Sequence, residues 1–151
     1  MSEQEVRRSI SIDAPPSAVW EAVHDFGGHG KWMPGAAEAQ SHMVWSGDPN
    51  TPGTERRFEL PGNSVFAERL NRIDHQQRQL AYSIVEAPLA ISGHEATISV
   101  DADGPASVVR WTARFESDDA TARELDAFMG TQNFEPGLAG LKSYVEGSRT
   151  A

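Results

Sequence analysis

The residues of this sequence that could do chemistry are ionisable side chains on strand faces that are otherwise apolar. Alternate residues of a strand share a face, and this rule places five polar residues among apolar neighbours: Arg56, Glu68, Tyr82, Glu86 and His94. In a cavity, Glu68 or His94 could move protons, while Tyr82 or Arg56 could stabilise an enolate oxygen. Glu68, Tyr82 and His94 are therefore the candidate catalytic residues.

The same residues also allow a purely structural interpretation. An isolated buried charge is costly, so Arg56 and Glu68 could form an ion pair inside the fold. Glu86 and His94 would then lie at the rim of the sheet, in water. The residue pattern alone leaves both interpretations open.

The turn predicted at 61–63 sets how these residues meet across the sheet. It places Arg56 directly opposite Glu68, and opposed residues have Cβ atoms about 5 Å apart, close enough for an ion pair. With the next two turns, one row across the sheet is expected to contain Arg56, Glu68, Tyr82 or Ile84, and His94. We expect Arg56 to keep Glu68 ionised, as a hydrogen-bond acceptor for a ligand and not as an acid.

The elements that carry these residues have a two-residue period and span 37–46, 54–60, 64–73, 79–86, 91–101 and 107–116. The breaks between them are rich in turn-forming residues, so the segments predict antiparallel hairpins. A further strand is predicted over 6–13. After it, apolar residues at helical spacing predict a short helix that ends at Gly27-Gly28, with a second short piece around 29–33.

The last part of the chain changes to helical spacing. A helix is predicted over 119–147, capped by Asp118 or Asp119, with two pairs of side chains on the sheet: Phe128/Met129 and Leu138/Leu141. Pro136 should kink or break this helix. The break is expected near 130–132, with Asn133 capping the restarted helix, and it would be either a passive kink or a ligand gate.

These elements predict an α+β fold, in which a curved antiparallel sheet of about seven strands wraps around the long C-terminal helix. The space between sheet and helix is the natural ligand site. Besides the candidate catalytic residues, the residues predicted to line it are Trp32, Arg56, Phe58, Phe66, Glu86, Ile98, Trp111, Phe115, Phe128, Met129 and Phe134.

Composition excludes several classes of protein. A chain of 151 residues suits one ligand-binding domain, expected over 1–151, and the lack of cysteine excludes disulfides and thiolate chemistry. No histidine pair or glycine-rich loop has the spacing of a metal or phosphate site, so we expect no metal and no cofactor. A formal charge of −9 without a basic patch argues against nucleic-acid binding. Without a long apolar run or signal peptide, a cytoplasmic protein with no membrane insertion is expected.

Several motifs resemble one known superfamily. The pattern Ile12-Asp-Ala-Pro-Pro-Ser-Ala-Val-Trp20-Glu-Ala-Val looks like the opening of the START-like, birch-pollen-allergen-like (SRPBCC) superfamily. Further pieces resemble its small bacterial members, described as polyketide cyclase/dehydrase-like: Trp32-Met-Pro, Ala67-Glu68-Arg69-Leu70, Leu80-Ala-Tyr82-Ser-Ile-Val-Glu86 and Gly137-Leu-Ala-Gly-Leu-Lys142. The resemblance implies a helix-grip fold with two short helices after the first strand and an internal cavity for a hydrophobic small molecule.

The resemblance does not imply one chemistry, because function depends on the site and not on the fold. One hypothesis is a binding protein or carrier that holds a hydrophobic or aromatic molecule. The alternative is a cofactor-independent polyketide cyclase, aromatase or dehydratase that uses the cavity Glu, His and Tyr residues for proton transfer. The oligomeric state is not readable from the sequence.

Overall fold

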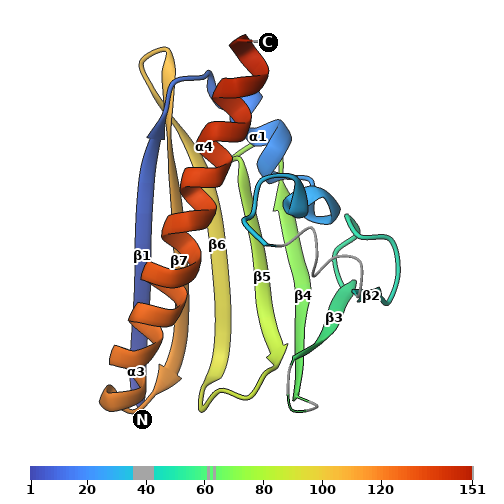
Figure 1. Cartoon of the computed structure of the whole chain (residues 1–151), viewed down its shortest axis with the longest axis vertical. Helices are drawn as coiled ribbons and strands as arrows, with labels where there is room; N and C mark the ends of the chain where they lie inside the picture. Colours follow the sequence, from blue (N-terminus) through green and yellow to red (C-terminus); the bar gives the residue numbers. More distant parts are fainter. Residues whose placement is uncertain (36–42, 61, 63, 151) are drawn as a thin grey trace.

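The computed structural model describes the chain except for residues 36–42, 61, 63 and 151. Figure 1 shows a broad sheet with one long helical segment lying across it and two short helices beside that segment. The strands are β1 Ser2–Ile12, β2 Val44–Trp45, β3 Glu55–Leu60, β4 Ser64–Asp74, β5 Gln79–Glu86, β6 Ser92–Asp103 and β7 Ala106–Ser117. The helical elements are α1 Pro16–Val23, η1 Phe26–Lys31, α3 Asp119–Leu125, η2 Asp126–Phe134 and α4 Glu135–Thr150.

The seven-stranded sheet is antiparallel throughout, in the order β1-β7-β6-β5-β4-β3-β2. The predicted hairpins are therefore confirmed, and β1 joins β7 at the far side of the sheet. β1 starts at Ser2, earlier than predicted, because its polar first residues still pair with the end of β7, from Ser2 opposite Ser117 onward. A strand was expected over 37–46, and residues 37–42 of that range lie outside the described part of the chain. The described strand within the range is β2.

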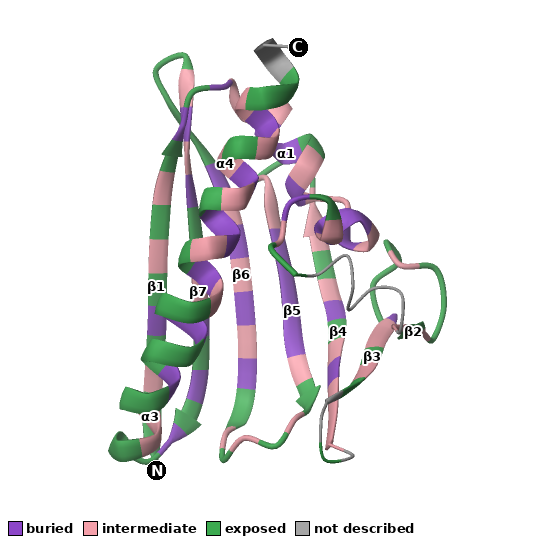
Figure 2. Cartoon of the chain, in the orientation of Figure 1, coloured by how far each residue is buried: buried purple, intermediate pink, exposed green. Residues whose placement is uncertain are grey.

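The helical C-terminal segment packs its apolar side chains against the sheet, and the buried ones are Leu125, Met129, Phe134, Leu138, Leu141 and Val145. Figure 2 shows this buried stripe on the helix facing buried residues of the strands. Asp118 is the N-cap, since its carboxylate accepts a hydrogen bond from the Thr121 backbone N–H at 2.7 Å. Phe128 differs from the prediction, because 43 % of it is exposed.

The helix break predicted before Pro136 is wrong. The chain stays helical, but η2 is wound as a π-helix, and the Glu135 N–H donates to the Gly130 carbonyl five residues earlier. The wider π turn accommodates Pro136, which lacks an N–H and crowds the preceding turn. The helix therefore continues through the proline.

Arg8 on β1 holds the π-helical segment at both ends. Its guanidinium pairs with Asp126 at 3.1 Å and with Glu135 at 2.8 Å. Gly130 lies under that guanidinium, and a Cβ atom there would collide with Arg8. A side chain at position 130 would therefore force the Arg8 guanidinium to shift.

Among the described residues, no helix is long and apolar enough to cross a membrane.

Candidate functional site

A pocket of about 390 Å³ lies between the sheet, η1 and η2. The residues lining it that the sequence singled out are Trp32, Arg56, Phe58, Phe66, Glu68, Tyr82, His94, Trp111, Phe128, Met129 and Phe134. The fold therefore brings together the three candidate catalytic residues, Arg56 and most of the aromatic candidates.

Ile98 and Phe115 lie in the hydrophobic core and are not among the described residues that line the pocket. Their strand face is the predicted one, and both are almost fully buried. Alternation assigns a side chain to a face but not to a level along the strand. The strand of Ile98, β6, is packed against α1.

Glu86 lies on the opposite face of the sheet, which corrects the prediction. Ala67 pairs with Glu86, whereas the next residue, Glu68, pairs with Ile84. This β-bulge inserts one residue into β5 and reverses the face of the sheet to which the following side chains of β5 point. The Glu86 side chain is 51 % exposed and accepts a hydrogen bond from Arg57 Nη1 at 3.1 Å.

The pocket also contains residues that the sequence reasoning did not select: His29, Gly30, Met33, Pro34, Gly35, Met43, Ile84 and Asn133. Most of them belong to η1 and its surroundings, where a 3₁₀ turn gives no extended period to interpret. Ile84 was an alternative member of the predicted row, Asn133 was a predicted cap, and Met33 and Pro34 belong to the Trp32-Met-Pro motif, but none of them had been assigned to the ligand site.

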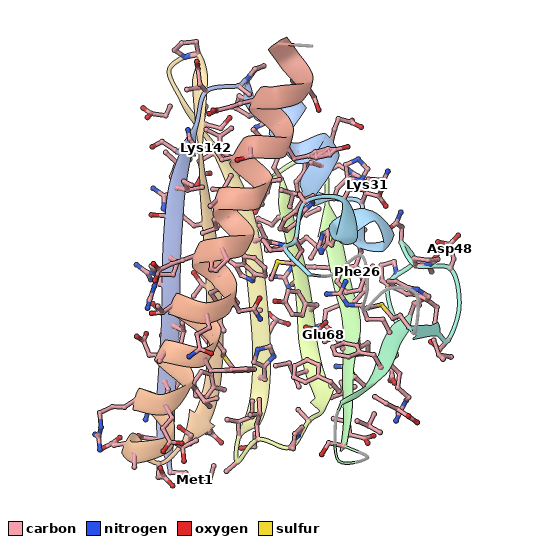
Figure 3. All side chains as sticks on the ribbon, in the orientation of Figure 1. Met1, Phe26, Lys31, Asp48, Glu68 and Lys142 are labelled. Atoms are coloured by element: carbon pink, nitrogen blue, oxygen red, sulfur yellow. The ribbon has the colours of Figure 1, made fainter. Side chains whose placement is uncertain are left out.

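Arg56 and Glu68 form the charged centre of the pocket. They are directly opposed across β3 and β4, as predicted, and Arg56 Nε donates to Glu68 Oε1 at 2.8 Å. Each side chain is only 12 % exposed. The guanidinium also lies over the Phe26 ring, 3.9 Å from its centroid. Phe26 and Glu68, both labelled in Figure 3, are thus linked through one arginine.

Tyr82 and Trp111 are hydrogen-bonded to each other inside the pocket wall. Trp111 Nε1–H donates to the Tyr82 hydroxyl oxygen at 3.1 Å. Burial raises the pKa of Tyr82 well above its usual value, and the negative charge of Glu68 raises it further. Tyr82 therefore keeps its proton at neutral pH.

His94 is held by the backbone of the neighbouring strand. The Ile84 N–H donates to His94 Nδ1 at 2.8 Å. Burial lowers the pKa of His94 to about 4, so the imidazole is neutral at pH 7. Since Nδ1 accepts a hydrogen bond, the proton of the neutral ring is on Nε2.

His29 is a second neutral histidine among the residues that line the pocket. Its Nε2 lies 2.8 Å from the Val23 carbonyl, which can only accept, so the proton is on Nε2, and no described residue donates to Nδ1. Burial, together with the positive charge of Arg56, lowers the pKa of His29 to about 3. Its ring packs on Phe26 and Trp32, with centroids 5.3 and 4.9 Å away.

Aromatic rings form much of the remaining wall. Trp111 stacks on Phe134 of η2 at a centroid distance of 4.4 Å, and Phe58 stacks on Phe66 at 5.3 Å. Trp32 meets the edge of Trp111 at 6.2 Å. Such walls with a few polar groups are typical of sites for flat organic molecules.

No described group of three or more His, Asp or Glu side chains is arranged to hold a metal ion.

Solved structures similar to this chain come from several organisms. A solution structure of a Thermobifida fusca protein is 34 % identical, covers 93 % of this chain and 92 % of its own, and has a TM-score of 0.82. A protein from Nitrosospira multiformis is 24 % identical, with coverages of 96 % and 99 % and a TM-score of 0.76. A point mutant of norcoclaurine synthase from Thalictrum flavum, in complex with a transition-state analogue, has a TM-score of 0.80 at 14 % identity, with coverages of 98 % and 97 %. At these lower identities the likeness concerns the fold alone.

No curated protein matches the chain. The family model described as polyketide cyclase / dehydrase and lipid transport matches residues 3–146, which is nearly the whole sequence. With its seven-stranded antiparallel sheet and long C-terminal helix, the chain belongs to this family and has its helix-grip fold.

Proposed function

We propose that the protein is a single-domain binding protein or carrier that holds a hydrophobic or aromatic small molecule in this pocket. The observation behind the proposal is the lining, in which aromatic rings surround an ion pair that is neutral as a whole. Apolar surface drives association, and the few polar groups orient the ligand. The family description, which includes lipid transport, is consistent with this role.

The polar groups favour binding over catalysis because most of them have protein partners. Arg56 is paired with Glu68, the Tyr82 oxygen accepts from Trp111, and His94 Nδ1 accepts from a backbone amide. A general base works best with a pKa near the operating pH, and the pKa of His94 is lowered to about 4.

Native mass spectrometry of freshly purified protein, combined with tryptophan fluorescence titration, tests the proposal. Trp32 and Trp111 line the pocket, so flat aromatic compounds should change their emission. Ile84→Phe should fill the pocket and weaken binding at least tenfold. Val85→Phe is the matched control, since Val85 adjoins it on β5 but is 39 % exposed. If no compound binds below millimolar concentration, the proposal fails.

A cyclase, aromatase or dehydratase is the second candidate function. It is favoured by the Glu68 carboxylate, a proton acceptor that lines the pocket. Product formation from an acyclic poly-β-ketone would test it. Glu68→Gln should then abolish turnover while the substrate still binds. If the unaltered protein shows no turnover, the catalytic function is refuted and the binding function is the one that remains.

A further inference from the structure

The Tyr82 hydroxyl is a hydrogen-bond donor toward the pocket. An indole N–H can only donate, so the contact with Trp111 Nε1 uses a lone pair of the Tyr82 oxygen and leaves its hydrogen free. No described residue accepts that hydrogen, and Tyr82 lines the pocket. The hydroxyl hydrogen is therefore available to a bound molecule.

The imidazole of His94 is a second donor of fixed orientation. Every fully buried side-chain nitrogen or oxygen in the described part of the chain has a hydrogen-bond partner. Nδ1 is the ring nitrogen of His94 with a described partner, so Nε2 is not fully buried, and His94 is one of the residues that line the pocket. Because the Ile84 N–H occupies Nδ1, the hydrogen on Nε2 is the one that His94 offers.

The two donors lie on neighbouring strands and on one face of the sheet. Tyr82 on β5 pairs with Ala96 on β6, and His94 precedes Ala96 by two positions on that face. The centroids of the Tyr82 and His94 rings are 6.2 Å apart. Both donors are neutral at pH 7, and the nearby charges of Arg56 and Glu68 compensate each other.

We infer that Tyr82 and His94 form a two-donor site for one carbonyl oxygen, so that the pocket selects an uncharged aromatic ketone over the hydrocarbon or carboxylate of the same ring system. This inference rests on the proposed binding function and specifies its ligand. A hydrocarbon gives neither donor a hydrogen-bond partner, which costs affinity relative to the ketone. A carboxylate must be desolvated beside Glu68, and no unpaired cation among the described lining residues compensates it.

Three probes with one ring system test this selectivity: 2-acetylnaphthalene, 2-ethylnaphthalene and 2-naphthoate, titrated by fluorescence and calorimetry. The ketone should bind at least tenfold more tightly than the other two, since each hydrogen bond contributes roughly two- to tenfold. The carbonyl stretch of the bound ketone should shift to lower frequency in the infrared spectrum, as expected for an oxygen that accepts hydrogen bonds.

Variants separate the two donors from the rest of the pocket. Tyr82→Phe and His94→Leu should each lower the ketone-to-hydrocarbon affinity ratio by roughly two- to tenfold and reverse part of the infrared shift. His94→Gln should restore the ratio, because an amide can accept from the Ile84 N–H and still donate. Tyr144→Phe, which removes the hydroxyl of the other tyrosine, lies outside the pocket and should change nothing.

Equal binding of ketone and hydrocarbon would overturn the inference while the binding function stands. Tighter binding of 2-naphthoate, lost in Arg56→Met, would also overturn it and would make Arg56 the anchor. If none of the three probes binds and no retained molecule appears in native mass spectra, the proposed function itself fails, and the inference with it. Melting curves by circular dichroism establish that each variant is folded.

Discussion

The ion pair in the pocket gives the sharpest test of the energetics described above. Two charges about 4 Å apart attract by about 4 kcal/mol at an effective dielectric constant of 20. Arg56 and Glu68 are each only 12 % exposed, so removing the cation leaves a nearly buried carboxylate without compensation. We expect Arg56→Met to lower the free energy of unfolding by about 3–5 kcal/mol.

Glu68→Gln should cost less, about 1–3 kcal/mol, because the arginine keeps other partners. Its guanidinium remains over the Phe26 ring at 3.9 Å and within 3.5 Å of the Phe26 carbonyl. In the double variant neither charge is left alone. The loss should therefore be smaller than the sum of the two single losses, with a coupling energy of about 2 kcal/mol.

Chemical denaturation of the four proteins in the mutant cycle measures this coupling. The chain offers a matched control in Arg57 and Glu86, which join β3 to β5 across the sheet but at 47 % and 51 % exposure. That cycle should give about 0–1 kcal/mol, which added salt should reduce. Strictly additive losses at Arg56 and Glu68, or equal coupling in the two cycles, would refute the reasoning.

Further expectations concern the core, the histidines and η2. Leu141 is fully buried, so Leu141→Asp should lower stability by several kcal/mol; an unchanged melting temperature would show that its face is not covered. The lowered pKa values of His29 and His94, about 3 and 4, mean that the unfolded chain binds more protons below pH 6.5. Stability should therefore fall as the pH drops from about 6.5 toward 4, by up to about 1.4 kcal/mol per pH unit for each histidine, and His94→Gln should flatten the curve. Gly130→Ala should displace Arg8 and speed hydrogen exchange in 126–134; unaltered exchange there would contradict the close packing.

The strands and one cross-strand pair could be predicted because both depend on local rules. The two-residue period located β3 to β7 within a few residues, and the short turn before Ser64 set the register that opposes Arg56 and Glu68. Alternation and turn length are properties of neighbouring residues, so a sequence carries them directly.

The features that could not be predicted depend on contacts distant in the sequence. The bulge that turns Glu86 outward is a property of how β4 and β5 pair, and neither strand shows it alone. His29 enters the pocket from a 3₁₀ turn without periodicity. The π-helical segment before Pro136 lies against Arg8, which is more than a hundred positions earlier in the chain.

The winding of η2 has a consequence for how chain length varies among proteins of this architecture. Met129 and Phe134 are five positions apart and both buried, a spacing that a π turn brings to one side and an α turn does not. If a residue were deleted between them, the turn could rewind as an α-helix, and Leu138 would keep facing the sheet. The same deletion within α4 would rotate everything after it by about 100° and expose its apolar stripe. Alignments of such proteins should therefore place a one-residue gap in 129–134, although this range is helical. The pocket wall would change size at the position of that gap.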